Sequence, residues 1–521
     1  MAICWTFAVP AKAADDSPTP SFRLEVAEAS ADDRAIAEFY RRHDYPALWT
    51  GADDAPRRTA LFQALLNAGD HGLPEGRYQA HELMARFAAV QSEGQRARLD
   101  VAVTRAFVQY AHDVRTGFLT PSDIDATMVR EVSVRDTSAM LEGFFNADPQ
   151  DYLANLPPQM PEYAQLQKTR LDLLDTIASG GWGPAIKASK LEPGDSGGEV
   201  IALRDRLVAL GYMQRSVTAE YDGAISRAVQ IFQIDQGLTA DGVAGESTIS
   251  ELNRSAAERL ASVTVGLERL RWMNGLPLGQ RHVWVNLPDF TAKLVENGRT
   301  VFESVTVVGQ NRPDTRSPEF SDQIEFMVVN PTWNVPRSIT VKEYLPMLQK
   351  NPQSVGHLRI VDRRGRAVDR SAVDFTQFTA QNFPFSMSQA PSSRNALGLV
   401  KFMFPNKWNI YLHDTPQKPL FKKESRAFSH GCIRMGDPFG FAYALLSVQS
   451  NDPEGLFKSH LATGVESTIS LDKPVPVHLV YFTAWPDARG HVGYRRDVYG
   501  RDQAIFDAMR AAGVVLPEVQ G

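Results

Sequence analysis

The sequence is poor in cysteine, in long apolar runs and in excess charge of either sign. Its 521 residues include only two cysteines, Cys4 and Cys432, which cannot form a framework of disulfides. No stretch of 18 or more apolar residues is present, so no transmembrane segment is expected in the mature chain. The net charge of −6 lacks the basic excess of nucleic-acid binders. A hydrophobic content of 43% excludes a disordered chain and, at this length, predicts several domains.

Metal-binding patterns are also missing. The eleven histidines form no His-Glu-x-x-His motif and no tight cluster with carboxylates, which are the arrangements that hold zinc in peptidases. A zinc peptidase is therefore disfavoured. We expect neither a metal nor an organic cofactor.

The first residues resemble the second half of a secretory signal. A short apolar stretch leads to an Ala-x-Ala pattern at Ala11-Lys12-Ala13, and a polar segment follows. We therefore expect residues 1–14 to be a signal-like segment and the protein to be periplasmic. The positively charged beginning of a signal is missing, so the true start is expected upstream. The alternative is a frayed cytosolic tail. Cleavage would leave Cys432 as the only thiol, and a lone thiol in an exported protein needs a reason.

Hydrophobic periodicity predicts a largely helical first part. Residues 22–188 are expected to form a helical scaffold, with the clearest apolar face running from Val103 to Val114 and ending at Gly117. Residues 255–275 are expected to be a helix that returns to this scaffold.

A compact module is predicted between these helical parts, over 189–254. Its turn dipeptides flank a helix on which Ile231 and Phe232 are expected to point inward. The module resembles the three-helix peptidoglycan-binding module of wall enzymes, through Leu191-x-x-Gly194-Asp195-x-Gly197 and Phe232-Gln233-x3-Gly237-Leu238-x2-Asp241-Gly242. Because such residues build turns and cores, they argue for the fold, and glycan binding remains an open question.

From residue 276 onward the apolar pattern changes to period two. Alternating runs predict a β-rich catalytic domain over 276–480, with a hairpin turn at Asn297-Gly298 and a helix start at Asp437-Pro438. Residues 341–395 interrupt the strands as a polar segment with helical and irregular parts, and we expect them to form a lid. Residues 481–521 are expected to be a β-α tail. The fold class is therefore multidomain α+β.

The candidate catalytic residues lie in two short stretches of the sequence. His413-Asp414 ends a strand, and Ser429-His430-Gly431-Cys432 places the lone thiol after a glycine. A cysteine nucleophile needs a neighbouring base or cation, and two histidines and Arg434 are near in sequence. Asp414, through its side chain or its carbonyl, is the candidate that orients His413. The amides around Gly431 and Cys432 are candidates for an oxyanion hole.

This pattern resembles the signature of YkuD-type L,D-transpeptidases, in which a histidine precedes Ser/Thr-His-Gly-Cys by about 14 to 17 residues. Here the fifteen residues 414–428 separate His413 from Ser429. The order of parts resembles the large L,D-transpeptidases of Gram-negative envelopes, and Arg434 stands where shorter members usually have Asn. Two further blocks match, Asn330-Pro331-Thr-Trp333-Asn-Val-Pro336 and Asn395-Ala-Leu-Gly398-x-Val-Lys401.

The resemblance implies a reaction on peptidoglycan stem peptides. Cys432 attacks the carbonyl of the third stem residue of a tetrapeptide, D-Ala leaves, and a thioester forms. His413 takes the thiol proton and returns a proton to the leaving amine. An amine of a second stem then resolves the thioester and gives a 3→3 cross-link. The resemblance also implies acylation by carbapenems and insensitivity to penicillins.

The resemblance further implies supporting roles around the thiol. Arg434 is expected to position substrate or to hold the cysteine loop. His430 is expected to be structural or on the oxyanion side rather than the base. Substrate contacts are expected from Trp333, Tyr411, Ser429 and Asn395.

Two alternatives remain open from the sequence. A cysteine L,D-carboxypeptidase would share the acyl-enzyme and use water as acceptor, and a non-catalytic wall-binding protein would keep only the module. The intact pair of His413 and Cys432 argues against the second. Expected partners are stem peptides, glycan strands and other wall-synthesis enzymes, and nucleic acid is not among them.

Overall fold

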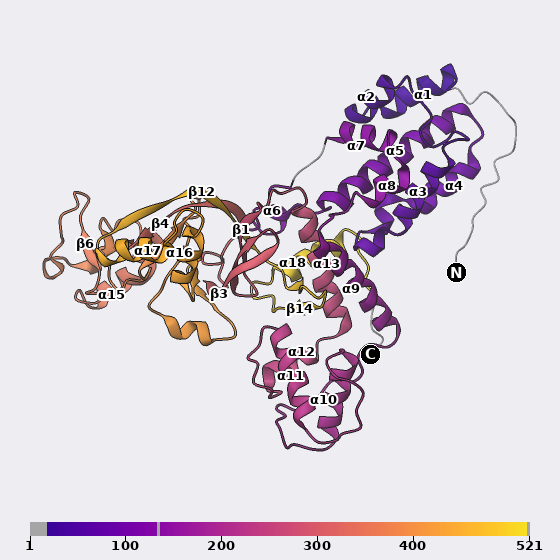
Figure 1. The fold of residues 1–521 in the computed structure, drawn as a ribbon. Helices are drawn as coiled ribbons and strands as arrows, with labels where there is room; N and C mark the ends of the chain where they lie inside the picture. Colours follow the sequence, from indigo (N-terminus) through magenta and orange to yellow (C-terminus); the bar gives the residue numbers. More distant parts are fainter. Residues whose placement is uncertain (1–17, 133–135, 518–521) are drawn as a thin grey trace.

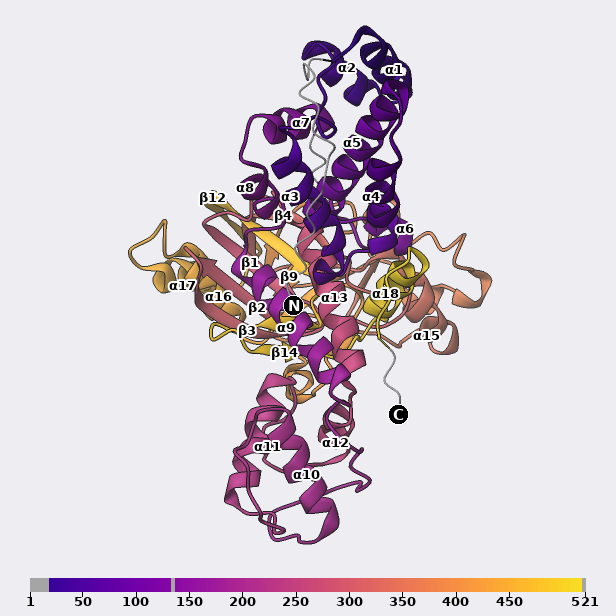
Figure 2. The same cartoon turned by 90° about the vertical axis from the view of Figure 1, so that its right-hand side faces the viewer.

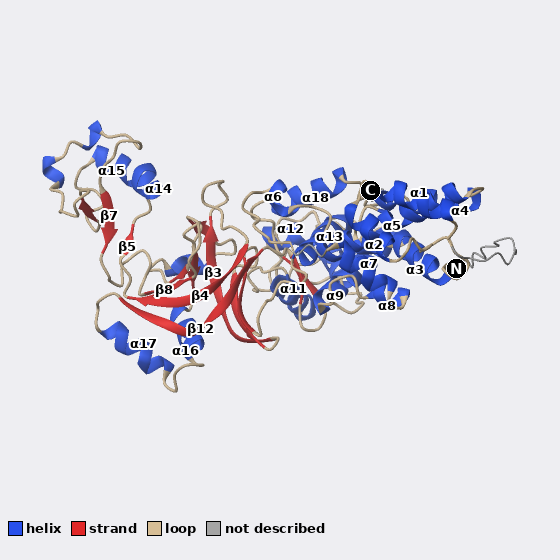
Figure 3. Cartoon of the chain, turned by 90° about the horizontal axis from the view of Figure 1, so that it is seen from above, coloured by secondary structure: helices blue, strands red, loops and turns tan. Residues whose placement is uncertain are grey.

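A computed structural model describes residues 18–132 and 136–517, so the predicted signal-like segment lies outside the described residues. The chain is elongated: the N-terminal helices lie at one end and the β-rich domain at the other, and a three-helix module projects from the middle (Figure 1). The view from above shows the strands gathered in one half of the molecule and the helices of the scaffold in the other (Figure 3). The predicted α+β, multidomain fold class is confirmed.

The N-terminal helices surround the long helix α5, which begins at Glu93 after the cap Ser92 and ends at Thr116 before Gly117. Gly117 has a φ of 88°, which favours glycine and explains the stop. One hydrophobic core lies between these helices. Their bounds are α1 (Pro20–Ser30), α2 (Arg34–Arg42), α3 (Ala55–Leu66), α4 (Ala80–Ala89), α5 (Glu93–Thr116), α6 (Pro121–Ile124), α7 (Thr137–Phe145) and α8 (Pro149–Ala154), with 3₁₀ turns at Ala68–His71 and Glu75–Tyr78.

Helices α9 (Pro161–Ala178) and α13 (Ala256–Trp272) pack on each other and share a separate core with the C-terminal hairpin. Ser255 and Glu258 form a capping box at the start of α13. On α13, the fully buried ion pair of Glu268 and Arg271, 2.7 Å apart, ties the helix to the scaffold: Glu268 accepts from the Phe118 amide. Helix α13 is thus in contact with the end of the N-terminal scaffold.

The module consists of α10 (Gly198–Ala209), α11 (Gly223–Asp235) and α12 (Glu246–Leu252) around its own small core. It hangs below α9 and α13 in two perpendicular views (Figures 1 and 2). Phe232 is buried as predicted, but the inward orientation predicted for Ile231 is wrong, because Ile231 is 48% exposed. The side chains of neighbouring residues on a helix point in directions about 100° apart, so the narrow core of this module takes in only one of the two.

The β-rich domain is built on a nine-stranded sheet in the order β10-β3-β11-β9-β8-β4-β12-β1-β2. A further pairing of β2 with β3 closes the sheet on itself around an apolar core. The turn between β2 and β3 is Asn297-Gly298, as predicted, and both residues have positive φ. The strands are β1 (Arg281–Asn286), β2 (Thr291–Glu296), β3 (Arg299–Gly309), β4 (Phe320–Val329), β8 (Val400–Met403), β9 (Leu412–His413), β10 (Ala427–Ser429), β11 (Ile433–Met435) and β12 (Ser467–Val480).

Two helices and a C-terminal extension complete this domain. Helix α16 (Pro438–Leu446) starts at the predicted cap, since the Asp437 side chain accepts from the Gly440 amide, and α17 (Pro453–Ala462) follows. A 3₁₀ turn spans Lys418–Lys422. The extension contains β13 (Ala484–Pro486), β14 (Val492–Tyr494) and α18 (Arg501–Ala511), and α18 contacts α13.

The segment between β4 and β8 is a small folded unit of its own. Our description of 341–395 as helical and irregular is incomplete, because strands β5 (Trp333–Asn334), β6 (Arg359–Val361) and β7 (Ser386–Gln389) form a separate sheet over a local apolar core. These strands are only two to four residues long, too short to show a period-two pattern in the sequence. The other elements are α14 (Arg337–Ile339), a π-helical turn (Thr340–Tyr344), α15 (Leu345–Lys350) and 3₁₀ turns at Arg370–Ala372 and Phe375–Gln377.

Within 18–132 and 136–517, no helix is both long and apolar enough to cross a membrane.

Candidate active site

Cys432 lies in the tight connection between β10 and β11. Gly431, directly before it, has a φ of 116°, and a Cβ at that position would come within 3.0 Å of Ile410. Ser429 bridges the connection, because its hydroxyl accepts from the Gly431 amide at 3.1 Å and donates to the Cys432 carbonyl at 2.6 Å. The Gly431 amide is thus engaged within the loop, which leaves the Cys432 amide as the better candidate for an oxyanion donor.

His413 and Cys432 are brought together by strand register. In the sheet, β9 lies between β8 and β11, and His413 is paired with Lys401 on one side and with Arg434 on the other. Paired residues on adjacent strands point to the same face of the sheet, which puts these three side chains in one row. Cys432 lies two residues before Arg434 and therefore on the same face, opposite the buried side chains of Leu412 and Ile433.

The orientation of His413 is set by a backbone carbonyl. Its Nδ1 lies 2.5 Å from the carbonyl oxygen of Asp414, and since a carbonyl only accepts, Nδ1 must carry the proton. The Asp414 carboxylate points elsewhere and accepts from the Leu399 amide at 2.9 Å and from Lys418 Nζ at 2.7 Å. Of the two ways in which Asp414 was expected to orient His413, the structure has the carbonyl. Nε2 of the neutral ring is then the basic nitrogen.

The electrostatics favour a neutral pair at rest. Burial raises the pKa of the Cys432 thiol to about 11, and hydrogen bonds from Tyr411 and the charges of Arg434 and Lys401 offset only part of this rise. Burial, together with the charges of Arg434 and Lys401, lowers the pKa of His413 to about 3. Between these values the thiol keeps its proton and the imidazole is uncharged, so the ring of His413 has a nitrogen that can accept a proton.

Two cations and a tyrosine surround the thiol. Arg434 Nη1 donates to Gln417 at 2.5 Å, while its buried Nε has no hydrogen-bond partner among the described residues. Lys401 lies 5.7 Å from the centre of the Tyr411 ring, and burial lowers the pKa of its ammonium group. Sequence reasoning did not single out Lys401 as a site residue. The alternation in β8 places Lys401 on the face opposite the core residues, but only the pairing of β8 with β9 puts it beside His413.

Ser317 is a second residue that sequence reasoning missed. Its hydroxyl donates to the Gly431 carbonyl at 2.7 Å and accepts from the Gly309 amide at 2.9 Å, so it joins the end of β3 to the cysteine loop. Ser317 lies in the loop between β3 and β4, more than a hundred residues before Cys432. No local pattern marks it.

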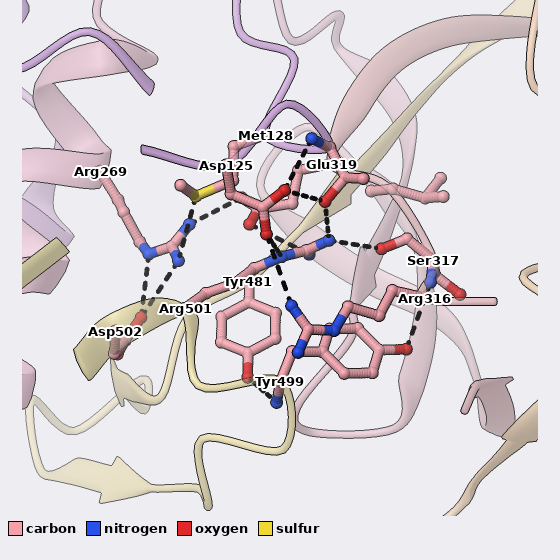
Figure 4. Close-up of polar contacts among 12 residues, drawn as sticks. Asp125, Met128, Arg269, Arg316, Ser317, Glu319, Tyr481, Tyr499, Arg501 and Asp502 are labelled. Atoms are coloured by element: carbon pink, nitrogen blue, oxygen red, sulfur yellow. Dashed lines mark hydrogen bonds and ion pairs between the residues drawn. The ribbon is translucent and has the colours of Figure 1, made fainter. Parts of the chain in front are cut away.

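A buried ionic network supports Ser317 from behind (Figure 4). Arg501 of α18 donates to the Ser317 carbonyl at 2.9 Å and pairs with Glu319 at 3.2 Å. Arg269 of α13 pairs with the same carboxylate at 2.6 Å and with Asp502 at 3.1 Å. Helix α13, the C-terminal extension and the catalytic sheet therefore meet directly behind the loop that carries the thiol.

The small unit over 331–397 faces the site from the other side. His430 Nε2 lies 2.5 Å from a Glu343 carboxylate oxygen in the π-helical turn, and Lys342 pairs with Asp314. All four side chains are between about one third and two thirds exposed. His430 is thus turned toward this unit.

A cleft of about 640 Å³ lies between this unit and the strand ends. Trp333, expected to contact substrate, lines this cleft. Asn395 does not line it: this residue is fully buried and its amide donates to the carbonyls of Pro331, Gln389 and Ala390, which shapes the loop. The other lining residues include Tyr344, His357, Arg394, Gln417 and Arg434.

Three parts of the chain match models of known protein families. Residues 280–451 match the model of an L,D-transpeptidase catalytic domain of the YkuD family, residues 196–252 match that of a "Putative peptidoglycan binding domain", and residues 34–169 match a scaffold domain. By these matches the β-rich domain is similar to L,D-transpeptidase catalytic domains, the three-helix module to putative peptidoglycan-binding domains, and the N-terminal helices to a scaffold domain.

Individual relatives cover parts of the chain. A "Putative L,D-transpeptidase" from Haemophilus influenzae is 32% identical over 225 residues, which are 43% of this chain and 45% of that protein, so the match spans less than half of the relative. Solved L,D-transpeptidases from Xylanimonas cellulosilytica (15% identity, TM-score 0.18) and Stackebrandtia nassauensis (14%, TM-score 0.22) each cover 57% of this chain. The chain covers 100% and 97% of those two structures.

Proposed function

We propose that this protein is an L,D-transpeptidase that forms 3→3 cross-links in peptidoglycan through a thioester on Cys432. The observation that carries the proposal is the row of side chains on β9 and β11, where a neutral His413 held by a carbonyl lies on the same face as the thiol. This is the arrangement that an acyl transfer through sulfur needs: a nucleophile, and a base with a free lone pair.

The steps follow from the protonation states. Nε2 of His413 accepts the thiol proton while Sγ attacks the carbonyl of the third stem residue, and the Cys432 amide donates to the developing oxyanion. His413 then gives the proton to the departing amine of D-Ala, which leaves the thioester. An amine of a second stem attacks the thioester carbonyl and restores the thiol.

Lys401 and Arg434 suit an anionic substrate. Stem peptides carry free carboxylates, and both cations lie in the row with His413. Besides burial, which has the largest effect, their charges lower the pKa of the imidazole. A substrate carboxylate paired with them would offset that effect and make His413 a stronger base when substrate is bound.

We further propose that the protein works in the periplasm, where its substrate lies. The signal-like segment supports export, and the peptidoglycan-binding domain supports contact with glycan strands. Other wall-synthesis enzymes are proposed as partners because they make the stems on which this reaction depends.

Mass spectrometry of wall fragments tests the reaction. Purified protein incubated with a disaccharide-tetrapeptide should yield 3→3 dimers and release D-Ala, and a carbapenem should add one adduct on the peptide that carries Cys432. Cys432→Ala should yield neither, while retaining the fold because little volume is lost. Shortened stems without dimers would identify a carboxypeptidase, and dimers made by Cys432→Ala would overturn the assignment of the nucleophile.

A further inference from the structure

A second cleft, of about 550 Å³, lies where three segments of the chain meet, and it shares no lining residue with the first cleft. Helix α9 forms one wall, the peptidoglycan-binding domain a second and the β13–β14 hairpin a third. Figures 1 and 2 both show β14 and α9 next to this domain. Most of the lining therefore comes from outside residues 196–252, to which the domain match is confined.

The hairpin is fixed to the domain by polar contacts. Arg495 donates to the Asp235 carbonyl at 2.7 Å, Arg496 pairs with Glu251 at 3.0 Å, and His491 lies 3.2 Å from the Asp235 carboxylate. These contacts fix the position of the hairpin relative to the three-helix domain. The cleft is thus a preformed feature, as is usual for ligand sites.

One buried acceptor at the cleft has no partner. Gln236 lines the cleft and is only 5% exposed, and within the described part of the chain its Oε1 accepts no hydrogen bond. An unsatisfied buried carbonyl is costly, and a ligand N–H placed in the cleft would satisfy it.

Half-buried aromatic side chains form the apolar part of the lining. Trp182, Tyr212 and Tyr494 contribute to it, and the Arg259 guanidinium lies 4.4 Å from the centre of the Tyr494 ring. Flat apolar faces beside a few polar groups suit a ligand that has both a ring face and hydrogen-bonding groups.

The cations at the cleft are paired with carboxylates: Lys168 with Asp172, Arg254 with Glu258, Arg259 with Glu251 and Arg489 with Asp487. A partly exposed cation in such a pair still has N–H groups for a ligand carboxylate. Arg254, about 42% exposed, is one of these. The charged lining residues are Lys168, Arg254, Arg259, Arg489, Asp172 and Glu251.

We propose that this cleft binds an N-acetylated amino sugar that carries an acidic peptide stem. The acetamido N–H donates to Gln236 Oε1, the sugar ring lies against Trp182 and Tyr212, and a stem carboxylate approaches Arg254. The proposal rests on the proposed function only for the choice of ligand class. It assigns glycan recognition to a composite site rather than to the three-helix domain alone.

The test is calorimetric titration with a disaccharide-dipeptide, which lacks the third and fourth stem residues and so cannot act as acyl donor. The full chain with Cys432→Ala is the reference. Gln236→Leu and Trp182→Ala should each weaken binding at least tenfold, and Arg254→Ala several-fold. Arg227→Ala, which removes an exposed cation elsewhere on α11, should leave the affinity unchanged.

Thermal unfolding provides the second measurement. The fragment should raise the Tm of the reference protein but not that of Gln236→Leu, and this comparison holds even where the variant is itself less stable. Unchanged affinity in both Gln236→Leu and Trp182→Ala would overturn the site. Binding that depends on Gln236 in a chain whose wild type forms no 3→3 dimers would overturn the proposed reaction and leave the cleft assignment standing.

Discussion

The two sides of the candidate active site are held in different ways. On one side, Ser317 donates to the Gly431 carbonyl of the cysteine loop, and Ser317 is backed by ion pairs whose side chains are almost completely buried. The unit over 331–397 meets the cysteine loop through the exposed pair of His430 with Glu343, and the β3–β4 loop through the exposed pair of Lys342 with Asp314. Removing one partner of a buried ion pair costs much folding stability, whereas an exposed ion pair contributes little to it. One side is therefore suited to fix the thiol that we propose as the nucleophile, and the other to move, which supports the proposal that it is a lid.

The largest expected effect concerns the thiol itself. With a pKa of about 11, only about one thiol in 10⁴ is ionised at pH 7, and the fraction rises about tenfold per pH unit. Alkylation by iodoacetamide should therefore be slow at pH 7 and should keep rising past pH 9. Glutathione, measured in parallel, should level off near the ordinary thiol pKa. A plateau of the protein rate below pH 8 would show that the resting site holds a thiolate.

The two histidines, one on each side, should differ strongly. His413→Ala removes the proposed base and should lower the rate of thioester formation by about 10²–10⁴-fold. His430→Ala removes only a contact to the lid and should cost less than about tenfold, as for an exposed pair. Single-turnover acylation by a carbapenem measures both. A larger loss in His430→Ala would exchange the two roles.

Breaking the buried network should destabilise the whole protein. Glu319→Gln leaves Arg269 and Arg501 without their shared carboxylate and should lower the free energy of unfolding by about 3 kcal/mol or more. Asp314→Asn, which breaks the exposed lid pair, should leave the denaturation midpoint where it was. Urea unfolding of the two variants, with equal slopes, makes the comparison. Equal midpoints would remove the distinction between the two sides.

Ser317→Ala tests the link between the network and the thiol. It removes the donor to the Gly431 carbonyl and the acceptor of the Gly309 amide, and each lost bond is worth about 1 kcal/mol, so acylation should slow by about tenfold. A positioning role predicts a lower kcat with an unchanged KM. Ser393→Ala, on the exposed lid loop, is the matched control. A change in KM alone would make Ser317 part of substrate binding.

The smallest effect concerns the lid. Hydrogen exchange of residues 341–395 should slow several-fold when a carbapenem adduct or a donor peptide fills the cleft, because exposed contacts open readily in the free protein. Exchange of 427–435 should hardly change, since that loop is already held. Equal exchange of 341–395 with and without ligand would leave the segment a passive insertion.

Short local patterns were enough to predict several helix ends and one hairpin turn. Gly117 after an apolar helix face, Asn297-Gly298 between alternating runs and Asp437-Pro438 at a helix start each specify backbone geometry within a few residues, and all three occur as predicted. Ile231 was misplaced because periodicity indicates a broad helix face and not how wide the neighbouring core is.

The sequence by itself determined the residue types of the site and their order: a histidine at the end of a strand, fifteen residues, then Ser-His-Gly-Cys. Only the tertiary structure decided that the Asp414 carbonyl, and not its carboxylate, orients His413, and that Lys401 and Ser317 belong to the site. Register and burial arise from contacts between segments far apart in the chain, and no local pattern records them. The pKa values follow the same rule, because desolvation is a property of the assembled fold.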